Sequence, residues 1–149
     1  MKKLGFIYAG QGSQAVGMGK SLYDTQPAAK QALDAVALDF DVKQLCFEGP
    51  MEQLSQTQYT QPCMVAVAIA ITETLRSQGI QPDYALGLSL GEYSALYAAG
   101  VWDAATTLEL VRFRGQVMEK AVHGMDTKMV AVLGMDRDPL AQICREASS

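Results

Sequence analysis

Residues 83–100 read D-Y-A-L-G-L-S-L-G-E-Y-S-A-L-Y-A-A-G, and the rest of the chain is organised around this stretch. An apolar run precedes a G-x-S-x-G motif centred on Ser89, and a helix-forming segment, residues 92–99, follows the motif and ends at a glycine. A strand, a sharp turn and a helix in this order predict a nucleophile elbow, which lifts a serine hydroxyl clear of the sheet. The turn is tight, so both flanking positions must be small, and Gly87 and Gly91 meet that requirement.

The five-residue motif alone is a weak signal, because glycine and serine are common residues. The alternative is an ordinary strand-to-helix turn that carries a solvated serine. The strand before the motif and the helix after it favour the functional interpretation. The first N–H groups of that helix would then face any negative oxygen that forms beside Ser89.

The composition is that of an ordinary single domain. The chain has 149 residues, 49% of them apolar, with a formal net charge of −4 and a pI near 4.9. This length can bury a hydrophobic core, and the slight acidity argues against nucleic-acid binding. We find no signal peptide and no stretch typical of a membrane span. Three cysteines without C-x-x-C spacing predict free thiols in a reducing, cytoplasmic compartment.

The segments before the elbow predict the rest of an α/β sheet. Residues 4–9 form an apolar run that predicts a first strand, and a glycine-rich loop containing Gln11 follows it. The loop can present backbone amides to a ligand, or it can be a plain turn. Residues 27–40, capped by Thr25, and residues 42–47 are expected to be helical. Residues 51–54 are interpreted as a turn.

The next helix is expected to open at Thr60-Gln61-Pro62, with Thr60 as its N-cap, and to be buried on most faces because residues 63–71 are apolar all round. Strands that alternate with helices predict a doubly wound, parallel sheet. The carboxyl ends of parallel strands meet at one edge, so the Gln11 loop and Ser89 are expected to share one site.

After the elbow, Asp103 is predicted to cap a helix that runs to about residue 122. Arg112 and Arg114 lie at the edges of its apolar stripe. Either arginine can pack its stem on the core with its charge in water, or bind a carboxylate at the rim of a pocket; periodicity alone favours the first interpretation. Residues 128–134 are predicted to form a strand and residues 136–147 a helix.

Several short motifs occur together in an order that matches a known family. They are Gly10-Gln11-Gly12-Ser13-Gln14, Thr60-Gln61-Pro62, Gly87-Leu88-Ser89-Leu90-Gly91-Glu92-Tyr93-Ser94-Ala95-Leu96, Ala99-Gly100-Val101 and Arg114-Gly115. On these residues the chain resembles the malonyl-CoA:acyl carrier protein transacylases of fatty-acid biosynthesis, and the acyltransferase domains of polyketide synthases. The resemblance covers the whole chain but only about the first half of the family's domain.

The resemblance implies a role for each matched residue. Ser89 would carry malonyl from coenzyme A to the phosphopantetheine thiol of the acyl carrier protein through an acyl-serine ester. The backbone N–H groups of Gln11 and Leu90 would form the oxyanion hole. Arg114 would bind the free carboxylate of malonyl, and Met118 would line the acyl pocket. No metal or other cofactor is implied, since coenzyme A enters as the thioester substrate.

The resemblance also implies that this chain works with a complement. The family's catalytic histidine lies in its second half, whereas the only histidine here, His123, falls in a connecting loop and is interpreted as a surface residue. The family usually has histidine before the nucleophile, where this chain has Leu88. Residues 1–125 would be the N-terminal part of a large, α/β-hydrolase-like subdomain, and residues 126–149 the start of a small ferredoxin-like subdomain. A C-terminal complement of the same domain is therefore an expected partner.

Two other functions remain open at this point. An α/β hydrolase or thioesterase would use the same elbow, although Arg114 and the Gln11 loop fit acyl transfer better. An inactive fragment or binding module would keep the fold and would not use Ser89 as a nucleophile.

Overall fold

The computed structural model describes residues 3–125 and 132–147. Strands β1 (Gly5–Tyr8) and β2 (Tyr84–Gly87) pair in parallel, in a register that places Gly5 opposite Tyr84 and Tyr8 opposite Gly87. The helices are α1 (Lys20–Thr25), α2 (Pro27–Asp34), α3 (Val42–Glu48), α4 (Met51–Leu54), α5 (Thr57–Ser77), α6 (Gly91–Ala98), α7 (Ala104–Val122) and α8 (Arg137–Ala147). The predicted α/β class with a small parallel sheet is confirmed.

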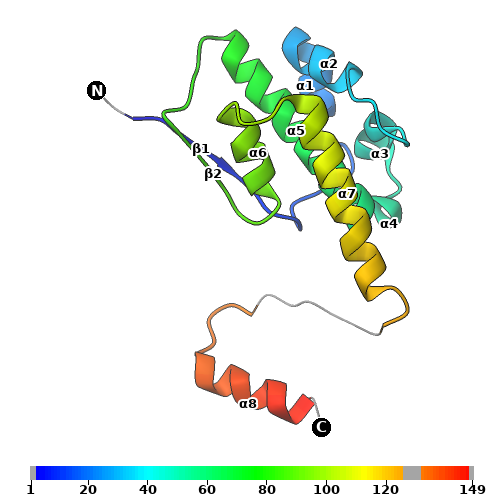
Figure 1. Cartoon of the computed structure of the whole chain (residues 1–149), viewed down its shortest axis with the longest axis vertical. Helices are drawn as coiled ribbons and strands as arrows, with labels where there is room; N and C mark the ends of the chain where they lie inside the picture. The colour runs from blue at the N-terminus through cyan, green and yellow to red at the C-terminus, as the bar shows by residue number, and fades with distance from the viewer. Residues whose placement is uncertain (1–2, 126–131, 148–149) are drawn as a thin grey trace.

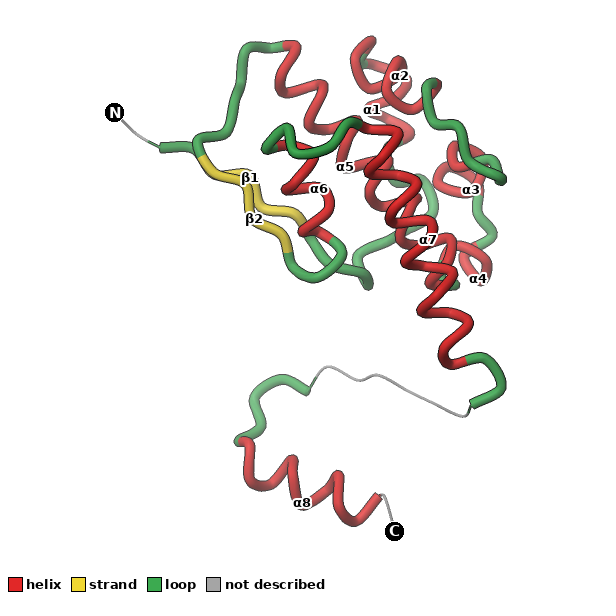
Figure 2. The backbone as a smooth tube through the Cα atoms, viewed as in Figure 1, coloured by secondary structure: helices red, strands yellow, loops and turns green. Residues whose placement is uncertain are grey.

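Helix α5 is the centre of this arrangement. It lies between the strand pair with α6 on one side and the small helices α1 to α4 on the other, and α7 crosses it (Figure 1). Figure 2 shows the two strands side by side with α6 against them. Helix α8 has no buried residues and lies apart from these elements. Helix α5 is apolar on every side because other elements pack against it from several directions, as the sequence predicted.

Helix α5 begins earlier than predicted. Its N-cap is Gln56, and Thr60 lies inside the first turns. The Thr60 hydroxyl donates to the carbonyl oxygens of Leu54 at 2.6 Å and Gln56 at 3.0 Å, so it satisfies acceptors and does not cap helix N–H groups. The interpretation of Thr60 as the N-cap was therefore wrong.

The crossing of α5 and α7 depends on a proline and a glycine. Pro62 lies inside α5 and has no N–H, so the carbonyl of Gln58 lacks its usual helical donor. Arg112 of α7 donates to that carbonyl at 2.8 Å. Gly115 lets the two backbones meet, because a Cβ at this position would lie 2.9 Å from Gln58 Cα and 2.9 Å from Thr57 O.

Arg112 is held on its other side by the segment after α2. Its Nε and second terminal nitrogen donate to the two carboxylate oxygens of Asp39 at 2.8 and 2.7 Å. These bonds hold the pKa of the Asp39 carboxyl below its usual range. The guanidinium also lies over the rings of Phe40 and Tyr59, 5.1 and 5.3 Å from their centroids. Arg112 is thus a structural residue that joins three segments.

Three other local predictions need correction. The helix expected over residues 27–40 ends at Asp34, and Thr25 closes α1 instead of capping α2, whose N-cap is Gln26. Residues 51–54 form the short helix α4. The strand expected over residues 128–134 lies mostly outside the described residues, and its described part, residues 132–134, is not a strand.

The two faces of the sheet differ in how they are covered. One face looks toward α5 and α6. The opposite face carries Ile7, which is 81% exposed, beside Tyr84 at 60% and Leu86 at 59%. Parallel sheets normally have both faces covered by helices, so a solvent-exposed apolar face of this kind is unusual in a folded domain. Among residues 3–125 and 132–147, no helix is long and apolar enough to cross a membrane.

We expect Gly115→Ala to lower the free energy of unfolding by about 1–3 kcal/mol, because the added Cβ must push two helix backbones apart. Urea denaturation followed by circular dichroism measures the change. Glu109→Ala, at an exposed position of the same helix, is the control and should stay within about 0.5 kcal/mol of the native chain. Equal stability of Gly115→Ala and the native chain would contradict the close crossing.

Candidate active site

Ser89 lies at the tip of the predicted elbow in a strained conformation. Its φ is +51°, and it is the only non-glycine residue with positive φ among those described. A Cβ on Gly87 would lie 2.0 Å from Gly91 C, and one on Gly91 would lie 2.3 Å from Tyr8 O. Both glycines are therefore required by close backbone contact, as the motif predicted. Left-handed backbone costs an ordinary residue about 1–2 kcal/mol, so the surrounding structure imposes it.

The hydroxyl of Ser89 is exposed and lies beside a positive charge. Arg114 of α7 donates from a terminal nitrogen to Ser89 Oγ at 3.2 Å. The guanidinium lies over the ring of Tyr93, with 5.7 Å to the centroid, and Tyr93 belongs to α6, the helix that the elbow starts. Periodicity favoured a stem packed on the core with its charge in water, whereas the structure brings the charged end of Arg114 to Ser89.

Two backbone N–H groups, one in the elbow and one in the loop after β1, concern the predicted oxyanion hole. Leu90 is the N-cap of α6, where helix N–H groups lack internal acceptors. Gln11 lies in the loop after β1, close to the elbow because Tyr8 and Leu88 are joined by a backbone hydrogen bond. Within the described part of the chain, neither the Gln11 nor the Leu90 N–H has a hydrogen-bond acceptor.

Side chains from α5 and α7 surround the Gln11 loop. Gln11 donates from Nε2 to Thr57 Oγ1 at 3.2 Å, and its Oε1 accepts from Gln61 Nε2 at 3.3 Å. Gln61 also contacts the sulfur of Met118 at 3.3 Å. Sequence reasoning assigned no role to Gln61 or Thr57, although Gln61 stood in the Thr60-Gln61-Pro62 motif.

The other nucleophiles and bases of the chain lie elsewhere. His123 is the exposed C-cap of α7, which agrees with its interpretation as a surface residue. Cys46 and Cys63 are buried and Cys144 is exposed, and none of the three forms a disulfide. The hydrogen bond with Cys46 and burial raise the pKa of Cys63, which disfavours its thiolate. No cluster of metal-ligating side chains occurs in residues 3–125 and 132–147.

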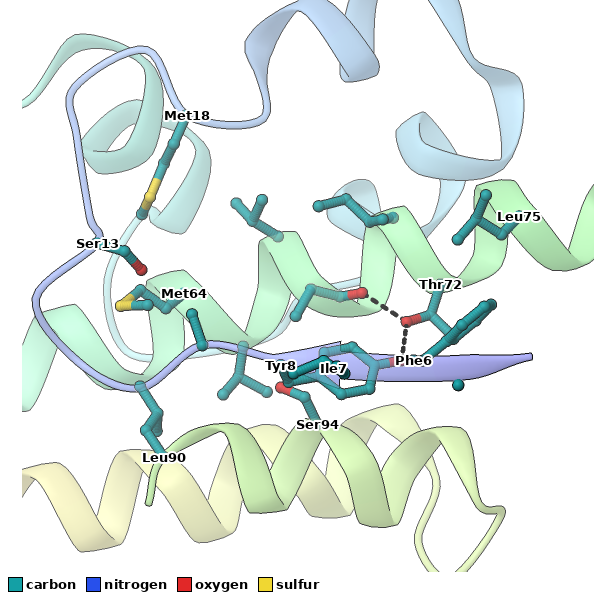
Figure 3. A pocket seen from close by; sticks show the side chains of 16 residues that line it. Phe6, Ile7, Tyr8, Ser13, Met18, Met64, Thr72, Leu75, Leu90 and Ser94 are labelled. Atoms are coloured by element: carbon teal, nitrogen blue, oxygen red, sulfur yellow. Dashed lines mark hydrogen bonds between the residues drawn. The ribbon is translucent and has the colours of Figure 1, made fainter. Parts of the chain in front are cut away.

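A cavity of about 420 Å³ lies between β1 and α5. Its lining is mostly apolar and includes Phe6, Met64 and Leu75, with a hydrogen bond of 2.8 Å between Tyr8 Oη and Thr72 Oγ1 (Figure 3). Burial raises the pKa of the Tyr8 hydroxyl. None of the predicted site residues except Leu90 lines this cavity, so it is separate from the exposed hydroxyl of Ser89.

Comparisons with known proteins agree with the geometry. A family model described as an acyl transferase domain matches residues 5–146. The malonyl CoA-acyl carrier protein transacylase of Bacillus subtilis (strain 168) is 43% identical over 145 residues, which cover 96% of this chain and 46% of that protein.

Solved structures give the same result. An acyl carrier protein S-malonyltransferase from Vibrio cholerae matches with a TM-score of 0.85 and 38% identity, over 99% of this chain and 49% of that one. A type II PKS acyl-carrier protein in complex with its malonyl-transacylase matches with a TM-score of 0.83 and 31% identity, over 99% and 49%. The chain thus spans about half the length of the proteins that it matches.

The backbone strain at the elbow can be measured with two variants that both remove the hydroxyl. We expect Ser89→Gly to unfold with a free energy about 1 kcal/mol higher than that of Ser89→Ala, because only glycine adopts positive φ without a steric penalty. Both variants lose the bond to Arg114, so that loss cancels in the comparison. Chemical denaturation of the two proteins side by side decides the matter, and an alanine variant as stable as the glycine variant would disprove the strain.

Proposed function

Because the chain belongs to the acyl transferase domain family, we propose that it is the nucleophile-bearing half of a malonyl-CoA:acyl carrier protein transacylase of fatty-acid biosynthesis. The observation that carries the proposal is the pairing of Ser89, exposed at a strained elbow, with the Arg114 guanidinium 3.2 Å from its Oγ. A nucleophile and a carboxylate receptor then lie side by side, as transfer of a dicarboxylic acyl group requires.

The proposed reaction has two acyl transfers. Ser89 Oγ gives up its proton to the general base of the complement and attacks the thioester carbonyl of malonyl-CoA; the C–S bond breaks, and the sulfur takes the proton and leaves as the coenzyme A thiol. The phosphopantetheine thiol of the carrier protein then attacks the acyl-serine ester, the ester C–O bond breaks, and the thiol proton returns to Ser89 Oγ as the new thioester forms. In both steps the N–H groups of Gln11 and Leu90 stabilise the negative carbonyl oxygen. Such donors are effective because they are fixed before the charge develops.

Arg114 would select the acyl group. In malonyl, a single methylene separates the reacting carbonyl from the free carboxylate, so a guanidinium beside Ser89 can bind the carboxylate while the carbonyl stays within reach of Oγ. A planar guanidinium binds a carboxylate with two parallel hydrogen bonds. Met118 lies one helical turn further along α7 and would line the acyl pocket. No metal or additional cofactor takes part in the proposed reaction.

The second half of the domain would supply the general base. A serine hydroxyl is a weak nucleophile without one, and loss of a triad member in serine hydrolases leaves only about 10³–10⁴-fold catalysis over water. The bare sheet face with Ile7, Tyr84 and Leu86 supports such a complement, since a parallel sheet needs cover on both faces. The open strand edges also favour pairing with further strands.

The domain organisation follows from the same proposal. Residues 1–125 would form part of the large, α/β-hydrolase-like subdomain, and residues 126–149 would begin the small ferredoxin-like subdomain. The acyl carrier protein is the proposed second partner. The solved complex of a carrier protein with its malonyl-transacylase, whose transacylase this chain matches over 99% of its length, supports that assignment.

The direct test is the intact mass of the chain after incubation with malonyl-CoA and a complement. The complement is the part of the Bacillus subtilis relative that this chain does not match, produced as a separate polypeptide. We expect one malonyl group on the native chain and none on Ser89→Ala, because the ester forms on that hydroxyl. If the two polypeptides associate and the native chain still gains no malonyl group, the chain is an inactive fragment.

Substrate selection gives a second prediction. In the complemented enzyme, Arg114→Ala should lower malonyl transfer about 10–150-fold, as expected for losing hydrogen bonds to a charged group, and should leave acetyl transfer unchanged or faster. Arg114→Lys keeps the charge but loses the planar guanidinium, so its rate of malonyl transfer should lie between those of the native enzyme and Arg114→Ala. Initial rates with malonyl-CoA and acetyl-CoA are compared. An equal loss with both thioesters would argue against the carboxylate role and in favour of a general effect on Ser89.

A further inference from the structure

Gln61 is completely buried, yet its polar end is only partly satisfied. Its Nε2 donates to Gln11 Oε1 at 3.3 Å and contacts Met118 Sδ at 3.3 Å. Its Oε1 is buried and has no hydrogen-bond partner among the described residues. A buried amide oxygen without a partner destabilises the folded protein by roughly 1–3 kcal/mol. If Gln61 served packing alone, an apolar residue of the same size would give a more stable protein.

Gln61 contacts the loop after β1, whose backbone conformation is not fixed by its own residues. Gln11 lies between Gly10 and Gly12, and Gly12 has a φ of +117°, so the backbone here has little intrinsic preference. The Gln11 side chain has two polar contacts, with Thr57 and with Gln61, and both belong to helix α5. These contacts anchor the loop to helix α5, at the centre of the fold.

We propose that Gln61 is a positioning residue for acyl transfer: it holds Gln11 so that the Gln11 backbone N–H faces the oxyanion, and it fixes the sulfur of Met118 beside the acyl group. This inference rests on the proposed function for its catalytic meaning. The anchoring itself rests only on the hydrogen bonds. Among the described residues Gln61 has no hydrogen bond to Ser89, and in this proposal it acts through Gln11.

The positioning role and a packing role predict different kcat values for Gln61→Met, which keeps the size of the side chain and removes the amide. Under either role the urea midpoint of the variant is equal to or above that of the native chain, because the unpaired buried oxygen is gone. If Gln61 positions Gln11, kcat for malonyl transfer in the enzyme with the Bacillus subtilis complement falls about 10–100-fold while KM stays within about two-fold; if Gln61 only packs, kcat is unchanged. The oxyanion exists only in the transition state, and a whole lost donor costs about 10²–10³-fold.

A second readout needs no activity. Hydrogen–deuterium exchange of the 149-residue chain, measured on the peptide that spans residues 10–14, should be faster in Gln61→Met than in the native chain. Gln58→Met is the matched control on the same helix, since the Gln58 side chain donates only to Gln56 Oε1, at 3.4 Å. The control should leave both the exchange of this peptide and the kcat unchanged.

Two results would overturn the proposal: unchanged exchange of residues 10–14 in Gln61→Met, or a loss of kcat no larger than the loss of folded protein. If the native chain with its complement transfers no malonyl, the proposed function fails. The exchange experiment then still decides whether Gln61 anchors the loop.

Discussion

The close crossing of α5 and α7 is the constraint on which the candidate site depends. Gly115 has no side chain, so α7 lies against the backbone at Thr57 and Gln58. Pro62 leaves the Gln58 carbonyl without a helical donor, and Arg112 fills that place from α7. Arg112 of α7 thus supplies the hydrogen-bond donor that α5 lacks. The close contact at Gly115 fixes the position and the rotation of α7 relative to α5. The guanidinium of Arg114 belongs to α7, so its place beside Ser89 follows from that geometry.

The features predicted most accurately from sequence are those that a short segment determines by itself. The elbow at Ser89 needs only a strand, two glycines and a helix, and its backbone geometry is as expected. The cap at Asp103 is equally local, because its carboxylate accepts from the N–H of Thr106 three residues later. The family resemblance was also correct, because it rests on several such segments in a fixed order.

The features that local patterns did not predict depend largely on contacts between distant segments, and the place of Arg114 was expected from the family resemblance alone. Arg112 and Arg114 are the same residue type two positions apart, and periodicity favoured a packed stem for either. Their roles differ because Arg112 meets Asp39 whereas Arg114 meets Ser89, and neither partner is near in sequence. Thr60 looked like a helix cap, but the N-cap of α5 is Gln56, four residues earlier.

The hydrogen bond between Arg114 and Ser89 has a chemical direction. A guanidinium can only donate, so it occupies a lone pair of Oγ, the same electron density that an attack on a carbonyl uses. In the proposed function, the carboxylate of malonyl would compete for the same N–H groups and, on binding them, would return the lone pair to the hydroxyl. One side chain would therefore both hold the dicarboxylic acyl group and make the nucleophile more reactive when that group is in place.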